Sequence, residues 1–540
     1  MMPIAMLRVI NLPVRLTSAQ VLFWSSLFIA LVCNYPFIHA VFLATSPNSL
    51  SEWLFFLSVP ALLLNITILL LSMAGAFLSP RFTAAITIVI SVLLLYATVS
   101  YGVVFDRSMF QNIAETHPAE AASYLNLSLF TFIIFVGFLP AVMLFRSSRR
   151  EKAKIRAKKL LRLNLFAVIS IALIAGFLFK DYAAVGRNHK ELTRYLVPYA
   201  FYNAAYKYVR DSYLRPPMSF RILDKSPGIA ANKKGQPKTV VVVVGETARA
   251  DKFGINGYYK NTTPHLSSIG AISFDKVTSC GTATAVSVPC MFSRLSRENY
   301  DSRLADSQDN VLDIIRRAGA TVSWIDNNSS CKGVCKRIDT IAYDPSRDSS
   351  LCDGDYCYDE VLLPLLEKKL AEQTGSQRVI VLHMIGSHGP TYYRRYPQTF
   401  RKFLPDCPRS DIQNCTEEQL QNTYDNTIAY TDHVLSRIIQ SLQNVPNASM
   451  LYISDHGESL GEAGMYLHGF PYAFAPEAQT HVPMIYWDSD LSDPNFQNCV
   501  SAQSRQPLSQ DNLYDTLLGL THVRSSTYQP EMDVLKSCRT

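Results

Sequence analysis

The sequence has 540 residues, enough for more than one folded domain. Hydrophobic residues make up 48% of it and charged residues only 18%, and most of the apolar excess lies before residue 180. This composition excludes a wholly soluble protein, whereas the rest of the chain has the composition of a soluble domain large enough to bury a full core.

Five apolar runs are long enough to cross a bilayer, which takes about 20 helical residues. They lie at about 19–43, 53–78, 84–104, 124–145 and 160–180. Pro36, Pro60 and Pro140 fall inside these runs, and membrane helices tolerate proline better than soluble helices do. The first run is not expected to be a cleaved signal peptide, because it is too long and no small-x-small cleavage site follows it.

A basic loop between the fourth and fifth runs sets the orientation. Residues 146–162 hold nine Lys and Arg against the single Glu151, and positively charged loops stay in the cytoplasm. With five spans, everything after about residue 181 then lies outside. A nucleic-acid patch is the alternative, but a short loop between two spans disfavours it, and no nucleic-acid partner is expected. The polar stretch 106–123 also faces outward, where it can meet the C-terminal domain.

The chain is expected to divide into three parts. These are a transmembrane domain at 1–180, an interfacial helical linker at 181–237 and an outward catalytic domain at 238–540. Tyr, Arg and Lys are interleaved up to about residue 222, as in helices that lie on a bilayer. The segment 224–238 contains two prolines and two glycines and is a candidate hinge.

Ten of the eleven cysteines lie after residue 181, and Cys33 alone lies in the apolar part. An even number in close pairs favours disulfides and an oxidising compartment, in agreement with the outward orientation. Zinc ligation by Cys331 and Cys335 is the alternative, but that pair lacks a matching second pair with nearby His. Proximity alone suggests the bridges Cys280–Cys290, Cys331–Cys335, Cys352–Cys357, Cys407–Cys415 and Cys499–Cys538.

The outward domain alternates strands and helices. Val240–Val244 is a continuous β-branched run of the kind found in parallel sheets covered on both faces. Further strands are expected at 320–324, 379–382, 450–453 and 482–487, and helices at 310–318, 360–372 and 422–442. This alternation predicts a three-layer α/β domain.

Polar side chains follow three of the predicted strands. Glu246 follows the first, His383 and His388 follow the strand at 379–382, and Asp455-His456 follows the strand at 450–453; His468 stands a little later. Each residue alone is more often a cap or a satisfied structural group. Ligands of open α/β sheets, however, bind outside the C-terminal ends of strands. Oxygen and imidazole groups gathered there favour a zinc site.

A turn of small residues, Ser279 to Cys290, leads into a predicted helix and holds Thr282 and Thr284. A hydroxyl at a helix start lies near the positive end of the dipole and free N–H groups, which favour a phosphate. Bound to zinc, it would become a usable nucleophile. The alternative is that Thr282 or Thr284 is only a helix N-cap, and this segment alone does not decide between the two.

Four motifs stand out together: Val244-Gly-Glu-Thr-Ala-Arg249, Ser279-Cys-Gly-Thr-Ala-Thr284 through Cys290, Ser387-His-Gly-Pro390 and Ser454-Asp-His-Gly-Glu-Ser-Leu-Gly461. They resemble the lipid A phosphoethanolamine transferases, a group that includes the mobile colistin resistance enzymes. The resemblance covers the whole chain. It implies a multi-pass protein of the Gram-negative inner membrane with five spans, a linker and a periplasmic three-layer α/β/α sulfatase-like domain of the alkaline phosphatase superfamily.

The resemblance also implies roles for individual residues. Thr284 matches the nucleophile, and the zinc ligands would be Glu246, Thr284, Asp455 and His456. The pair His388 and His468 matches histidines that contact the phosphoryl group or a second zinc. Near the transferred group lie the matches Asn328 and Lys332. Residues proposed to bind the phospholipid head group match Gln111, Asn112, Thr116 and Glu120.

These features predict a zinc-dependent, monomeric enzyme that lies among membrane lipids. It would transfer phosphoethanolamine from phosphatidylethanolamine to lipid A in two ping-pong halves and so confer polymyxin resistance. Zinc and Lys332 would offset the developing charge. Alternatives are another acceptor, such as core heptose or a periplasmic glucan, and glycerophosphate transfer as in lipoteichoic acid synthases, which the ten outward cysteines disfavour. A non-catalytic membrane-anchored sensor is disfavoured by the intact set of site residues.

Overall fold

The computed structural model of the chain describes residues 15–116, 118–230, 236–343, 349–353, 356–372 and 376–539. It separates into two compact units. The first comprises Met1–Arg107 and Leu125–Lys207, and the second comprises Ser108–Tyr124 and Tyr208–Thr540. The polar stretch between the third and fourth apolar runs therefore belongs to the same unit as the C-terminal domain, although more than 80 residues of the first unit separate them in sequence.

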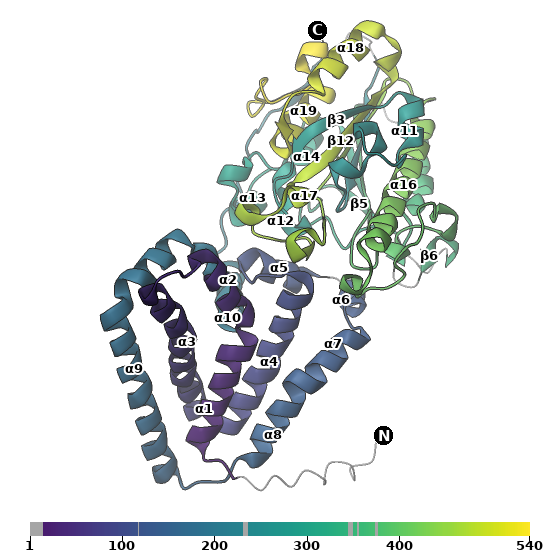
Figure 1. Cartoon of the computed structure of the whole chain (residues 1–540). Coiled ribbons are helices and arrows are strands. Elements are labelled where there is room, and N and C mark those ends of the chain that lie inside the picture. Colours follow the sequence, from purple (N-terminus) through teal and green to yellow (C-terminus); the bar gives the residue numbers. More distant parts are fainter. Residues whose placement is uncertain are drawn as a thin grey trace. The chain divides into compact units, whose positions relative to one another are not determined.

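The first unit is a bundle of apolar helices (Figure 1). They are α1 (Ser18–Phe28), α2 (Tyr35–Thr45), α3 (Leu50–Phe77), α4 (Pro80–Tyr101), α7 (Leu127–Phe132) continued by α8 (Leu139–Ser147), α9 (Ala153–Asn188) and α10 (Tyr199–Val209). Four described helices are long and apolar enough to cross a membrane, at 50–77, 80–101, 127–147 and 153–188. The pair at 18–33 and 35–45, bent by 53°, gives five if it is one span, so the predicted apolar runs all form helices.

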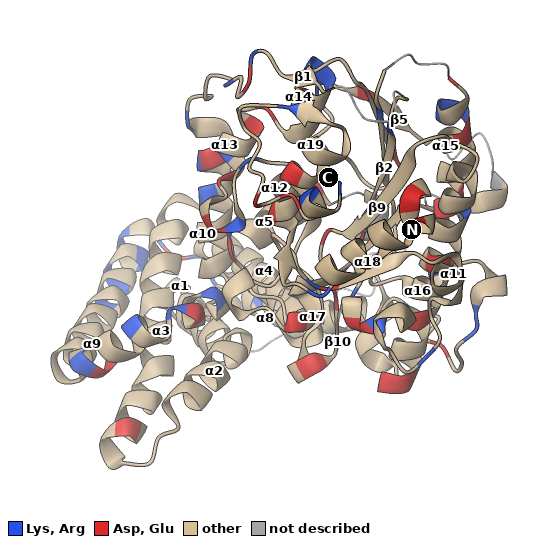
Figure 2. Ribbon diagram, turned by 90° about the horizontal axis from the view of Figure 1, so that it is seen from above, with Lys and Arg blue, Asp and Glu red and all other residues tan. Residues whose placement is uncertain are grey.

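The break between α1 and α2 shows how the bundle satisfies freed backbone groups. Pro36, at the start of α2, lacks an N–H and cannot continue the hydrogen-bond ladder. The buried Asn34 side chain instead donates to the carbonyls of Ile29 and Val197 and accepts from the Val197 N–H. Charged residues are sparse on the central helices, where α3 carries Glu52 and α4 carries Arg81 (Figure 2). Both features suit helices that face lipid.

The core of the second unit is an eight-stranded sheet in the order β13-β3-β12-β9-β2-β8-β4-β5. Its strands are β2 (Thr239–Gly245), β3 (Ile272–Thr278), β4 (Thr321–Asp326), β5 (Asp339–Ala342), β8 (Arg378–His383), β9 (Ala448–Ser454), β12 (His481–Asp488) and β13 (Leu508–Ser509). Every residue of β2 and β9 is buried. The central position of β2 explains its unbroken valine run, since both of its faces are covered.

The sheet is mixed, which corrects the expectation of a parallel sheet. β9, β2, β8, β4 and β5 run parallel, but β12 is antiparallel to both of its neighbours, β3 and β9. β3 was not predicted, because its exposed Asp275 and Lys276 interrupt the apolar pattern. The reversal brings the end of β3 and the start of β12 to the same edge as the C-terminal ends of β2 and β9.

Helices cover both faces of the sheet, as the predicted three-layer architecture requires (Figure 1). On one face lie α11 (Pro264–Ile269), α15 (Leu362–Ala371) and α16 (Glu417–Leu442). On the other lie α12 (Thr284–Met291), α13 (Ser302–Asp306), α14 (Val311–Arg317) and α19 (Leu513–Leu520). Two further helices, α17 (Glu477–Thr480) and α18 (Pro494–Gln503), flank β12 and β3. The three helices predicted from the sequence are α14, α15 and α16.

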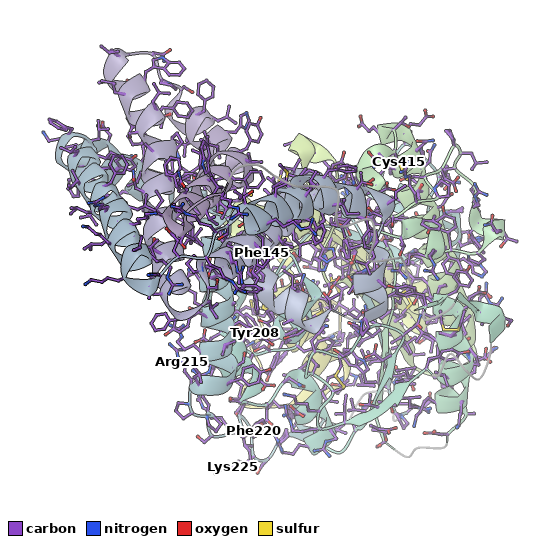
Figure 3. All side chains as sticks on the ribbon, turned by 90° about the horizontal axis from the view of Figure 1, so that it is seen from below. Phe145, Tyr208, Arg215, Phe220, Lys225 and Cys415 are labelled. Atoms are coloured by element: carbon purple, nitrogen blue, oxygen red, sulfur yellow. A yellow bond between two sulfur atoms is a disulfide. The ribbon has the colours of Figure 1, made fainter. Side chains whose placement is uncertain are left out.

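The segment that enters the second unit passes Tyr208, Arg215, Phe220 and Lys225 (Figure 3). Its later part is fastened to the catalytic domain. The Arg337 guanidinium lies 4.5 Å from the centre of the Phe220 ring, and Asp224 accepts hydrogen bonds from Ser525 and Ser526. β1 (Gly228–Ile229) then pairs with β14 (Val523–Arg524). The start of the predicted hinge is therefore docked, whereas Gly235 lies outside the described residues.

All five predicted disulfides are present, and Cys33 is the free cysteine of the described chain. Four of them close loops of 4 to 10 residues, and Cys499–Cys538 closes one of 39. The Cys331–Cys335 pair is a disulfide, so the zinc alternative for these residues is wrong. The bridge Cys280–Cys290 encloses the turn that carries Thr284.

Candidate active site

Three potential metal ligands meet at the C-terminal edge of the two central strands. Glu246 directly follows β2, and Asp455 and His456 directly follow β9. The parallel register pairs Gly245 with Ser454, so the side chains after these positions are brought together. A ligand atom of each lies within 4.8 Å of the others, and all three residues are fully buried.

The hydrogen bonds of this cluster leave acceptors facing one another. Asp455 Oδ1 accepts from the backbone N–H groups of Thr247 and His456. Asp455 Oδ2 is buried without a hydrogen-bond partner and lies 3.2 Å from His456 Nε2. His456 Nδ1 lies 2.9 Å from the Gly457 carbonyl and therefore carries the hydrogen, which leaves a lone pair on Nε2. A cation held between these two lone pairs would satisfy both, and one imidazole with two carboxylates suits zinc.

The charges of the cluster agree with this reading. Burial raises the pKa of Glu246, but interactions with His388, His456 and His468 outweigh it and lower that pKa below its usual value. Burial and the Glu246 carboxylate raise the pKa of Asp455. Two carboxylates in one dry site cannot both ionise at low cost unless positive charge lies beside them. The donor set therefore fits a divalent cation, which would keep both carboxylates charged.

Thr284 presents its hydroxyl to the same cluster. Its Oγ1 lies 3.1 Å and 3.3 Å from the two carboxylate oxygens of Glu246 and 3.3 Å from His456 Nε2. Thr284 is the first residue of α12, whose N-cap is Ala283, and no side chain caps this helix start. Thr282 turns away and donates to the Phe470 carbonyl. Neither threonine is the helix N-cap, so the alternative that Thr282 or Thr284 only caps the helix is wrong. The Thr284 hydroxyl is directed at the cluster instead.

Backbone strain and close packing hold the two ligand turns. Thr247 has a positive φ of 60° and is fixed by Asp455 Oδ1 and by Tyr424, whose hydroxyl donates to the Thr247 carbonyl at 2.6 Å. An added Cβ on Gly457 would lie 2.0 Å from the Ala478 carbonyl oxygen. Only glycine at this position therefore allows the backbone after His456 to lie against Ala478 in α17, just before β12.

Of the two residues expected near the transferred group, one joins the cluster. The Asn328 amide donates to Glu246 Oε2 and to the Met384 carbonyl, both at 2.9 Å. Lys332 lies on the same turn with a φ of 47°. Its ammonium donates to Ser329 Oγ at 3.1 Å, so the structure places Lys332 beside the turn and outside the Glu246 cluster.

A second group of buried polar side chains adjoins the first. The His468 ring centre lies 4.4 Å from that of His456 and 5.4 Å from that of His388. His388 Nδ1 lies 2.8 Å from the Gly389 carbonyl, which leaves Nε2 as an acceptor, as in His456. His468 Nδ1 lies 3.3 Å from the fully buried Glu458, and burial raises the pKa of Glu458 well above its usual value.

Glu458 lies in one of the four sequence motifs, but no role was predicted for it. Its position two residues after His456 was the available signal, because a carboxylate on the same short turn as a metal ligand is well placed to orient a nearby imidazole. The structure shows that it contacts His468 and so ties the two histidine-bearing turns together.

Of the expected head-group residues, Gln111 and Asn112 lie on helix α5 (Arg107–Glu115), where the Gln111 amide donates to Glu115 at 2.9 Å and Asn112 lies at this site. Gly469 has a φ of 87°, and a Cβ added there would lie 2.9 Å from Met109 Cε and 3.4 Å from Asn112 Nδ2. Asn112 therefore lies against the turn that carries His468. Thr116 directly follows the helix and donates to the Asn112 carbonyl at 2.7 Å. Glu120 falls in α6 (Pro118–Ser123), and its side chain lies outside the described residues.

Comparison with known proteins agrees with this geometry. Residues 238–523 match the Sulfatase family model, and residues 61–213 match the model described as phosphoethanolamine transferase EptA/EptB. Phosphoethanolamine transferase EptA of Escherichia coli K12 is 40% identical over 541 residues, which cover 97% of this chain and 98% of the relative. The chain belongs to the phosphoethanolamine transferase family. It is therefore an enzyme that transfers a substituted phosphate group.

Further relatives extend the comparison. Phosphatidylethanolamine transferase Mcr-1 of Escherichia coli is 39% identical over 73% of this chain and 75% of the relative. The structure of the integral membrane lipooligosaccharide phosphoethanolamine transferase A of Neisseria meningitidis superposes with a TM-score of 0.90 at 35% identity, covering 97% of this chain and 99% of that one. The periplasmic domain of EcEptC from Escherichia coli, solved in complex with Zn, matches with a TM-score of 0.50 over 58% of this chain and 90% of that one; at 22% identity this likeness shows the fold alone.

These comparisons also fix the cellular setting. The chain is an integral membrane protein with several spans and a periplasmic catalytic domain. The predicted membrane spans, the sulfatase-like fold and the outward placement of the C-terminal domain are thereby confirmed.

Proposed function

We propose that the chain moves phosphoethanolamine from phosphatidylethanolamine to lipid A through a covalent intermediate on Thr284. The observation that carries the proposal is the Thr284 hydroxyl, held within 3.3 Å of both Glu246 and His456 in a buried, metal-competent cluster. The donor is supported by the name of Mcr-1, a phosphatidylethanolamine transferase. The acceptor is supported by the Neisseria relative, which acts on lipooligosaccharide.

The proposal includes one resident zinc ion held by Glu246, Asp455, His456 and the oxygen of Thr284. Bound there, zinc would lower the pKa of the Thr284 hydroxyl and offset negative charge on the phosphoryl oxygens. The unpartnered Asp455 Oδ2 and the His456 Nε2 lone pair, which faces the Thr284 hydroxyl, support this assignment. By the family resemblance, His388 and His468 would contact the phosphoryl group or hold a second zinc during turnover.

In the first half of the reaction, the Thr284 oxygen attacks the phosphorus of phosphatidylethanolamine. A bond forms between Thr284 Oγ1 and phosphorus, and the bond from phosphorus to the diacylglycerol oxygen breaks. The Thr284 proton passes to the adjoining carboxylate and imidazole groups, of which Glu246 is nearest at 3.1 Å. Diacylglycerol leaves as its oxygen takes up the proton released by Thr284, which the His388–His468 pair is assigned to relay.

In the second half, a phosphate oxygen of lipid A attacks the same phosphorus from the side opposite Thr284. The new phosphorus–oxygen bond forms as the bond to Thr284 Oγ1 breaks, and the threonine oxygen takes up the proton that the attacking lipid A phosphate hydroxyl releases. Asn328 holds Glu246 in place through its amide. Lys332 is assigned to the negative oxygens of the entering phosphate, which its ammonium can meet after leaving Ser329.

The donor head group is assigned to the side of the site lined by α5. Asn112 lies beside the His468–Gly469 turn, and Thr116 and Glu120 follow it along the chain. These polar groups suit an ethanolamine ammonium and a phosphodiester at the surface of the surrounding lipids. The proposal also keeps the domain boundaries at residues 180 and 237. It further includes a monomeric enzyme that binds no nucleic acid.

The test is mass spectrometry of lipid A from cells that express the chain. Lipid A carrying added phosphoethanolamine is expected with the parent and not with Thr284→Ala, a variant that removes one small buried group. The ammonium masks a surface phosphate, so the parent cells should also resist polymyxin, and the variant cells should not. Modified core heptose or periplasmic glucan with unmodified lipid A would overturn the acceptor and leave the chemistry standing.

A further inference from the structure

Gln510 lies one residue beyond the short edge strand β13, far in sequence from every motif described above. β13 pairs in parallel with β3, and Ser509 is opposite Thr278. Gln510 is fully buried. Its backbone is fixed by a reciprocal pair of bonds, in which the Ser509 hydroxyl caps the turn and the Asn512 side chain accepts from the Ser509 N–H.

The Gln510 side chain makes three hydrogen bonds that join the two halves of the site. Its amide nitrogen donates to the carbonyls of Ser454 and Asp455, both at 2.7 Å. Its amide oxygen accepts from the Cys280 N–H at 2.7 Å. Ser454 and Asp455 carry the metal-ligand turn, whereas Cys280 begins the turn that carries Thr284.

The turn from Cys280 to Thr284, which carries the nucleophile, is tied to α12 beyond Cys280. A restraint on Cys280 therefore also restrains Thr284. The Gly281 N–H donates to Ser287 Oγ in α12 at 2.8 Å, and the Cys280–Cys290 disulfide ties the turn to the same helix. No bond on this path is exposed to water, since Cys280, Ser287 and Gln510 are all buried. The position of Cys280 therefore sets the position of Thr284 relative to Asp455.

We infer that Gln510 is a positioning residue that fixes the distance between the Thr284 hydroxyl and the Asp455–His456 ligand turn. The inference rests on the proposed function of Thr284 and Asp455. Gln510 touches neither substrate nor metal, so its loss should leave the ligands in place but let the nucleophile turn drift. A shift of this kind slows the chemical step more than it weakens binding.

Gln510→Met tests the inference, because it keeps the length of the side chain and removes all three hydrogen bonds. Gln377→Met is the matched control. Gln377 is also a buried glutamine that accepts a backbone N–H, from Lys238, but it lies at the opposite end of β2 from Glu246. Both variants remove buried hydrogen bonds, and only the first lies between the two turns.

The full-length proteins in detergent are mixed with phosphatidylethanolamine without acceptor, at saturating zinc and saturating donor. The rate at which Thr284 gains phosphoethanolamine is followed by intact-protein mass spectrometry, and bound zinc is measured by elemental analysis. In Gln510→Met, Thr284 should gain phosphoethanolamine about 10–100-fold more slowly than in the parent, with zinc content unchanged. Gln377→Met should load at the parent's rate.

Loading of Gln510→Met at the parent's rate would overturn the inference. So would loss of its zinc, which would assign Gln510 to metal binding, or equal slowing in Gln377→Met, which would show a general effect of buried defects. If Gln510→Met does not fold, Gln510→Asn keeps the amide, loses reach and should show the same slow loading. A parent that never loads Thr284, or loads it without zinc, would instead refute the proposed function.

Discussion

Asp455→Asn is a sharp test of the metal site, because the structure fixes how the new side chain must lie. Asp455 Oδ1 accepts two backbone N–H bonds, from Thr247 and His456. The asparagine oxygen must keep that place, so its amide nitrogen replaces Oδ2, 3.2 Å from His456 Nε2. The variant therefore gains a donor where the parent has two opposed acceptors, and it loses a zinc ligand.

The gained donor and the lost zinc ligand change the free energy of unfolding in opposite directions. Without metal, the new hydrogen bond is worth about 0.5–1.5 kcal/mol, and removal of one buried negative charge beside Glu246 adds to it. With zinc at about 100 times its Kd, the parent gains about 2.7 kcal/mol from binding. If loss of the ligand raises Kd about 100-fold, the variant gains only about 0.4 kcal/mol at the same zinc concentration. The order of stability should therefore reverse when zinc is added.

The assay is thermal unfolding of the full-length proteins in detergent, once with a zinc chelator and once with excess zinc. Asp455→Asn should unfold at a higher temperature than the parent in chelator and at a lower temperature in zinc. A variant that is less stable than the parent in chelator would show that Oδ2 is satisfied in the metal-free protein. An equal zinc effect in both proteins would show that Asp455 is not a ligand.

Three further predictions concern the nucleophile, a buried carboxyl and the cysteines. Thr284→Ser should retain a trace of transfer because it keeps a hydroxyl, whereas Thr284→Val should have none; equal activity in a transfer assay would contradict the assigned role. Asp359 accepts hydrogen bonds from the Ile385 and Gly386 N–H groups, and burial raises the pKa of its carboxyl. The contribution of Asp359 to folding stability is therefore present at low pH and is lost as the pH rises through the pKa of the folded protein. The stability advantage of the parent over Asp359→Asn should therefore narrow with rising pH in unfolding measurements, and a constant or widening gap would refute the sign. Thiol counting on the unfolded, unreduced protein should find Cys33 alone, and additional thiols would break the disulfide assignment.

Much of the fold could be predicted because its elements have strong local patterns. The unbroken valine run at 240–244 suits a central strand, and the helix expected at 310–318 lies at 311–317. The helix expected at 422–442 begins earlier, at Glu417, where a capping box at Thr416 marks its start. β3 and the reversal of β12 could not be predicted, because the direction of a strand depends on which neighbours it meets and not on its own periodicity. The mixed sheet therefore came from the structure.

Some residues of the candidate site could likewise be predicted from the sequence, and others could not. Glu246, Asp455 and His456 could be found because each directly follows a strand end, where parallel strands place their ligands. The residues of the turn alone left Thr282 and Thr284 as equal candidates, and the family resemblance singled out Thr284. The structure adds the physical reason, since Thr282 donates to the Phe470 carbonyl. Long-range side-chain contacts have no local pattern.

Gln510 illustrates this limit. It reaches Cys280 across 230 residues of sequence, and its own segment carries no motif. The placement of α5 against Gly469 is similar, since a one-residue contact between distant segments depends on how both are held. Polar residues that join distant turns become visible only when the fold brings their partners together.

The central claim is that Thr284 carries the transferred group. The full-length protein, incubated with phosphatidylethanolamine and no acceptor, is quenched in acid, digested and mapped by tandem mass spectrometry. The account predicts one phosphoethanolamine group on the peptide that spans Cys280–Cys290, localised to Thr284 and discharged when lipid A is added. A group on Thr282 or on another residue, or steady transfer to lipid A with Thr284 never modified, would contradict it.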